Sequence, residues 1–269
     1  MRTAEGWRAA MVDGMTDTEI RFERPPVRTV ELTLYFDQVG LKLTALAPLL
    51  STLTESFPDV TERFAQMPWG LENSNELPPL IEEGSTTFPF PSLTFANSEG
   101  HSISFQGDRL QLKWEFGEER TYPGYIQLRD ALAQEFERFT AHVGESTGED
   151  VHVKRVRAEY ENTMSTGIAW SVAQRARGID DNTDLQRIEG LGRFSSGGQF
   201  TFVGGELETA VDFAAVSHED AGRLSLRGTT AASSDVLDAL SALDVAHGHL
   251  LDCFATLTTS EQHDSWGKK

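Results

Sequence analysis

Cysteine is almost absent from this sequence, since Cys253 is the only one among 269 residues. A single cysteine excludes a disulfide within the chain and fits a reducing compartment. Long hydrophobic runs are also missing, because no stretch approaches the roughly 18–20 apolar residues that span a bilayer. Residues 1–11 contain arginines but no apolar core, so they lack the pattern of a secretion signal. We therefore expect a cytoplasmic protein that has no contact with a membrane.

Positive charge is scarce as well. The chain has 23 Lys and Arg against 42 Asp and Glu, which gives a net charge of −19, and only five of the basic residues are lysine. Such a negative field repels phosphate backbones and anionic lipids, so binding to nucleic acid is not expected. The acidity fits three interpretations: plain solubility, an acidic face for a basic partner, or mimicry of a nucleic acid.

Known catalytic motifs are missing from the chain. No Gly-x-Ser-x-Gly elbow is present, and the glycine pairs at 190–192 and 197–198 lack the pattern of a phosphate loop and fit hairpin turns. We expect no catalytic residue and no bound cofactor. The sequence leaves open whether the protein is an enzyme, and it favours a protein without enzymatic activity.

The densest group of metal-ligand side chains lies near the C-terminus. At about 100° per residue, His247 and His249 point roughly 200° apart on a helix and cannot hold one ion together. His247 lies on the apolar stripe, which favours a hydrogen-bonded core or interface histidine. We therefore expect no metal site in this group, which comprises Asp244, His247, His249, Asp252 and Cys253.

What the sequence does contain is alternating strands that lead into amphipathic helices. Residues 110–116 are apolar at every second position and precede a helical pattern at 125–143. Residues 224–226 alternate likewise and precede a helical pattern at 236–257. Period two indicates a strand with one buried face, and 3–4 spacing indicates a helix that covers such a face. The recurrence suggests two pseudo-repeated halves, although few residues match between them.

These patterns predict an α+β fold with a largely antiparallel sheet, or sheets, covered by amphipathic helices. We expect a disordered segment at 1–22 and two halves, 23–164 and 165–269, packed as one globular unit. Gly144 is expected to end the 125–143 helix, and 165–182 fits either a strand or a helix. Further strands are predicted at 30–36, 92–96, 101–106, 109–116, 151–160, 185–194, 199–203, 207–216 and 222–227, with a helix near 44–57 and a turn at 195–198.

The C-terminal residues predict a short final helix. Thr258 with Glu261, or Thr259 with Gln262, has the spacing of a capping box. Trp266 would then fold back onto the body of the protein. This docking explains the aromatic residue without any ligand.

Three short motifs carry a family resemblance. They are Pro25-Pro26-Val27 leading to Glu31, the run Arg157-Ala158-Glu159-Tyr160-Glu161-Asn162, and the tail Phe254, Thr258, His263 and Trp266-Gly267. In this order they resemble a sporadically distributed prokaryotic family of uncharacterised proteins of similar length. Tyr160 and Asn162 match the family's aromatic-x-Asn strand ending, whereas Glu161 replaces its usual apolar residue. The resemblance implies no established activity, and its patchy distribution points to a defence or toxin–antitoxin-type system.

Three functions stay open at this stage. The first is a non-enzymatic protein-binding or assembly module that binds a protein partner or forms a homodimer. The second is an enzyme or small-ligand receptor with a pocket between sheet and helices, lined by Trp114, Tyr160, Asn162 and His247. The third is an acidic mimic of nucleic acid, or an antitoxin. His263 and Trp266 complete the candidate pocket or interface residues.

Overall fold

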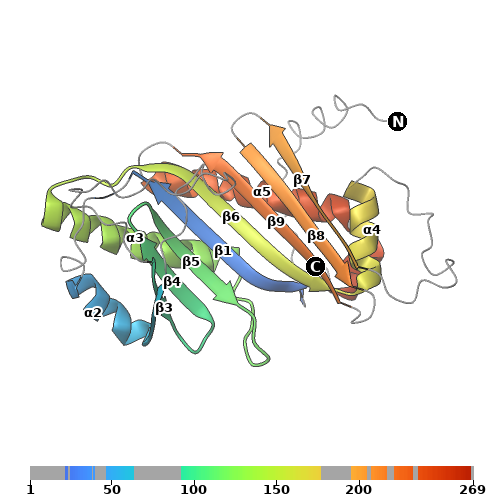
Figure 1. Ribbon diagram of the computed structural model, residues 1–269, viewed down its shortest axis with the longest axis horizontal. Helices are drawn as coiled ribbons and strands as arrows, with labels where there is room; N and C mark the ends of the chain where they lie inside the picture. The colour runs from blue at the N-terminus through green and yellow to red at the C-terminus, as the bar shows by residue number, and fades with distance from the viewer. Residues whose placement is uncertain are drawn as a thin grey trace, which may run out of the picture.

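The computed structural model describes residues 22–23, 25–37, 39, 47–63, 92–176, 195–204, 207–216, 221–232 and 236–267. Within these residues the fold is a nine-stranded antiparallel sheet with helices, as Figure 1 shows. The predicted α+β class is therefore confirmed. Among the helices of the described residues, none has both the length and the apolar character needed to cross a membrane.

Two long strands, β1 (Val27–Phe36) and β6 (Val153–Met164), lie side by side at the centre of the sheet. The strand order is β2-β3-β4-β5-β1-β6-β9-β8-β7. The strands beside β1 are β5 (Arg109–Glu115), β4 (His101–Gln106), β3 (Ser92–Ala96) and β2 (Asp59–Arg63). The strands beside β6 are β9 (Ala221–Ala231), β8 (Leu207–Val216) and β7 (Ser195–Gly204).

Two long helices cover one face of this sheet. Helix α3 (Tyr125–Thr147) packs on β5 and β1, and α5 (Val236–Leu257) packs on β6 and β9, behind the sheet in Figure 1. The strands alternate accordingly: Val30, Leu32 and Leu34 of β1 are fully buried in the core. The shorter helices are α2 (Ala47–Ser56) beside α3, α4 (Thr166–Ala176) on β8 and β9, and α6 (Ser260–Ser265) near the C-terminus.

The opposite face of the sheet is polar. Cross-strand partners of β6 and β9 form ion pairs there, and Arg227 Nε donates to a carboxylate oxygen of Glu159 at 2.9 Å. The Arg109 and Arg157 guanidinium groups lie 4.9 and 5.0 Å from the Tyr35 ring centroid. The helix-covered face therefore holds the apolar core.

Several predicted elements match the structure. Helix α5 and strand β3 have the expected bounds, and 101–106 and 109–115 form the expected hairpin. Strands followed by a long helix occur on both sides of the β1–β6 pair. Duplication of the two halves stays a prediction.

Other elements differ from the expectation. Helix α3 continues through Gly144 and ends at Gly148, whose φ of 73° is the left-handed conformation that favours glycine. The turn predicted at 195–198 is wrong, because these residues begin β7 and pair with β8. In the ambiguous stretch 165–182, residues 166–176 form helix α4, and residues 177–182 lie outside the described residues. Strand β2 was not foreseen because all its residues are exposed. The strand predicted at 185–194 lies outside the described residues.

Candidate binding pocket

A pocket of about 510 Å³ lies between the helix-covered face of the sheet and the helices α3 and α5. Its walls come from the start of α3, the middle of α5, strands β6 and β9, and the segment that leads into β1. Apolar and aromatic side chains dominate these walls, and the rest are uncharged polar groups. Among the described residues that line it, none is Lys, Arg, Asp or Glu.

The sequence places these side chains through simple periodicity. His247, Leu250, Leu251 and Phe254 have 3–4 spacing, so they share one face of α5. Tyr160 and Asn162 are two positions apart on β6 and therefore point to the same face of the sheet. The candidate residues Tyr160, Asn162 and His247 thus meet in one pocket.

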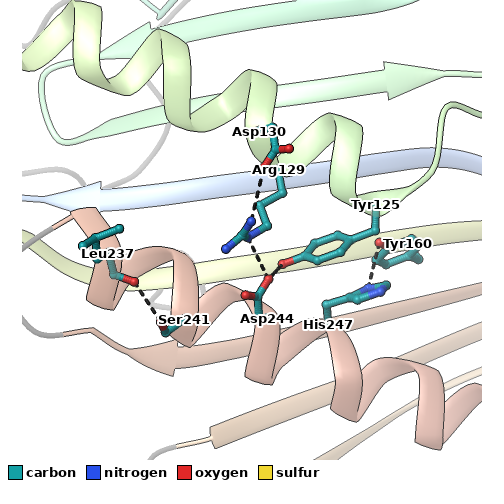
Figure 2. A network of polar contacts seen from close by, with 8 residues as sticks. All are labelled: Tyr125, Arg129, Asp130, Tyr160, Leu237, Ser241, Asp244 and His247. Atoms are coloured by element: carbon teal, nitrogen blue, oxygen red, sulfur yellow. Dashed lines mark hydrogen bonds and ion pairs between the residues drawn. The ribbon is translucent and has the colours of Figure 1, made fainter. Parts of the chain in front are cut away.

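Tyr125 connects α3 to α5 across the pocket wall. Its hydroxyl donates to Asp244 Oδ1 at 2.7 Å, and Arg129 Nε lies 2.9 Å from the same oxygen, as Figure 2 shows. The Tyr125 ring also stacks on the His247 imidazole, with centroids 3.7 Å apart and planes 12° apart. Burial, and then the Asp244 carboxylate, raise the pKa of Tyr125 far above its ordinary value, so the phenol stays protonated.

Tyr160 connects β6 to α5. Its hydroxyl lies 2.9 Å from His247 Nδ1 (Figure 2), which confirms that His247 is a hydrogen-bonded histidine. Burial lowers the pKa of His247 to about 4, and burial followed by the neighbouring Tyr122 raises the pKa of Tyr160. Both side chains are therefore uncharged near neutral pH.

Asn162 contributes a carboxamide to the wall. The side chain is only 3% exposed, and Nδ2 donates to the Leu224 carbonyl at 3.2 Å. That bond fixes the orientation of the carboxamide, because a carbonyl oxygen only accepts. Oδ1 is therefore the acceptor end of this side chain.

His263 and Trp266 do not line the pocket, but their rings contact Phe22 and Phe254, which do. The Trp266 ring centroid is 5.4 Å from that of Phe254 and 5.8 Å from that of Phe22, two residues that line the pocket. Thr258 donates to the Phe254 carbonyl at 2.5 Å, so its oxygen accepts from His263 Nε2 at 2.6 Å. The predicted final helix is confirmed as α6, with a capping box of Thr259 and Gln262.

Trp114, like His263 and Trp266, is not among the residues that line the pocket. It is buried on β5, and its ring centroid lies 5.3 Å from that of Tyr122, which does line the pocket. Sequence reasoning missed Tyr122, Tyr125 and Phe22. Tyr125 starts the apolar stripe of α3, but nothing in its spacing indicates that His247 lies opposite.

Two residues of the group near the C-terminus that has metal-ligand side chains, Asp244 and His247, bond to tyrosines instead. Asp244 accepts from Tyr125, and His247 Nδ1 bonds to Tyr160. Across the part of the chain that the structure describes, no three His, Cys, Asp or Glu side chains are grouped to hold an ion. Burial raises the pKa of the Cys253 thiol to about 11, so it stays protonated at neutral pH.

No protein-family model matches this chain, and no curated protein matches it in sequence. The family resemblance drawn from the short motifs therefore stays a prediction.

Proposed function

We propose that this protein binds a small, mostly apolar organic molecule in the pocket between the sheet, α3 and α5. The supporting observation is the pocket itself: a volume of about 510 Å³ with aromatic walls and converging Tyr160, Asn162 and His247. Ligand pockets typically occupy about 300–1,000 Å³ and combine apolar walls with a few polar groups. This is the second of the three functions that the sequence left open.

The electrostatics favour binding over catalysis. A general acid or base works best with a pKa near the operating pH. The pKa of His247 is lowered to about 4 and that of Tyr160 is raised, so both shifts lead away from neutrality. The pair is therefore better suited to hold a ligand than to transfer a proton.

A thermal-shift screen of small aromatic and alicyclic compounds tests the proposal. Leu251→Trp enlarges a side chain that lines the pocket on α5. Leu237→Trp is the matched control, because Leu237 lies on the same helix and is 76% exposed. We expect compounds that stabilise the wild type and Leu237→Trp by several degrees and leave Leu251→Trp unchanged. Hits that stabilise all three proteins equally, or a library without hits, would contradict the proposal.

A protein partner or a homodimer, in the cytoplasm, remains a second proposal. It is supported by the strand order, since β2 and β7 are the outermost strands among the described residues and all five residues of β2 are exposed. Edge strands of this kind pair readily with another chain. Light scattering at increasing concentration tests self-association, and a constant monomer mass would count against a homodimer.

A further inference from the structure

The Asn162 amide presents an acceptor to the pocket. This side chain is 97% buried, and Nδ2 is held by the Leu224 carbonyl. Among the described residues, no group donates to Oδ1. An acceptor in a mostly apolar wall is best satisfied by an N–H or O–H donor. The pocket therefore favours a ligand that carries such a donor.

The start of α3 presents donors to the same pocket. Residues 124–127 line it, and the N-cap, Gly124, has no side chain to accept from the first turn. The first backbone bond of the helix runs from Leu128 N to Gly124 O, so the N–H groups of 125–127 have no acceptor within α3. A Cβ built on Gly124 would meet nothing within 4 Å, so there is open space at this end. A ligand oxygen can accept there.

The side chains of the wall offer no opposite charge to an ionic ligand. Among the described lining residues there is no Lys or Arg to compensate an anion and no Asp or Glu to compensate a cation. Burial of an uncompensated charge is costly, and the Asn162 oxygen would repel a carboxylate. The net charge of −19 adds to the barrier against anions.

We infer that the ligand is neutral and that its polar end carries an N–H donor beside a carbonyl acceptor, as a primary carboxamide or a lactam does. The donor binds Asn162 Oδ1, and the carbonyl oxygen accepts from the first turn of α3. The apolar body of the ligand lies against Leu226, Leu250 and Phe254. This inference rests on the proposed function and adds the chemical class of the ligand.

Three matched probes test it by NMR titration of the full-length, ¹⁵N-labelled protein. They are 3-phenylpropanamide, 3-phenylpropanoate and 4-phenylbutan-2-one, which share an apolar body and differ in the polar end. We expect the amide to bind at least about tenfold more tightly than the carboxylate and the ketone, because only the amide satisfies Asn162 Oδ1.

Asn162→Leu should lower the affinity for the amide to that for the ketone, and it should leave the affinity for the ketone unchanged. Gln111→Leu is the control, because it also replaces a buried carboxamide by leucine, but on the polar face of the sheet. The order of the three affinities for the wild-type protein tests the inference even if Asn162→Leu does not fold.

Equal or tighter binding of the carboxylate would overturn the inference, as would no binding of the amide or full preference retained in Asn162→Leu. Library hits that Leu251→Trp blocks, together with equal affinity for all three probes, would leave the proposed function intact and refute only the ligand class.

Discussion

The Tyr160 hydroxyl and His247 Nδ1 lie 2.9 Å apart, although 87 residues separate them along the chain. The bond joins the central strand β6 to helix α5 beside the pocket. Since His247 also stacks on Tyr125 of α3, one imidazole connects the sheet with both long helices. The position of α5 and the shape of the pocket therefore depend on this residue pair.

Tyr160→Phe should lower the free energy of unfolding by about 1–2 kcal/mol, because His247 Nδ1 loses its partner in a mostly buried site. Urea unfolding measures this change. A cycle with His247→Phe and the double variant isolates the pairwise energy. Strict additivity of the two single changes would show that the contact contributes nothing to stability.

Stability should fall as the pH decreases from about 6.5 toward 4. The pKa of His247 is about 4 in the folded protein and about 6.5 when unfolded, so the unfolded chain binds the extra proton in this window. The stabilisation is complete above the unfolded pKa and is lost on acidification. At pH 4.5 the expected loss relative to pH 7 is about 2 kcal/mol.

The variant His247→Phe isolates this contribution from the other titrating groups. It keeps an aromatic ring against Tyr125 and cannot take up a proton. The difference in unfolding free energy between wild type and variant should therefore shrink by about 2 kcal/mol between pH 7 and 4.5. A difference that does not change with pH would show that His247 is not held neutral by burial.

Gly228→Ala should destabilise the protein by about 1–2 kcal/mol, because β9 and α5 approach closely there. A Cβ at Gly228 would lie 3.1 Å from the Ala246 carbonyl oxygen and 3.2 Å from Leu250 Cγ. Gly248→Ala on α5 is the matched control, since its Cβ would meet nothing within 4 Å. This control should gain about 0.5–1 kcal/mol from helix propensity. Equal effects in thermal unfolding would contradict the close approach.

Thr258→Val should lower the free energy of unfolding by about 1–3 kcal/mol, because His263 Nε2 loses its acceptor in a buried site. Thr256→Val is the control: its hydroxyl also donates four residues back, to Asp252, but it is exposed. We expect Thr258→Val alone to change the tryptophan fluorescence, as Trp266 loses its packing on Phe254. A loss no larger than that of Thr256→Val would refute a stabilising role for this contact.

Local patterns carried much of the fold, as α5 and β3 illustrate. The apolar stripe of α5 is strong along its whole length, and β3 was expected because the residues in and before it are too apolar for a free linker. Gly144 misled because a glycine inside a helix is tolerated when a later one, Gly148, adopts the left-handed conformation that ends it. The glycines at 197–198 also misled, because their pairing with β8 overrides their preference for a turn.

The pocket depended on contacts that no local pattern encodes. His247 was a candidate because it lies on the apolar stripe of its helix, and Tyr160 and Asn162 were candidates because they match the strand ending of the resembled family. Tyr125 was not a candidate, since its bond to Asp244 spans 119 residues and requires the packing of α3 beside α5. Spacing along one element shows which face a side chain occupies, but the element that lies opposite follows only from the tertiary fold.

Chemical-shift mapping of the wild-type protein with a small aromatic hit tests the central claim most directly. We predict that the amides that move cluster at the start of α3, at Asn162 on β6, and around Leu251 on α5, and that they saturate with one dissociation constant. Shifts that scatter over the polar face of the sheet, or no saturable shifts at all, would contradict the assignment of this pocket as the binding site.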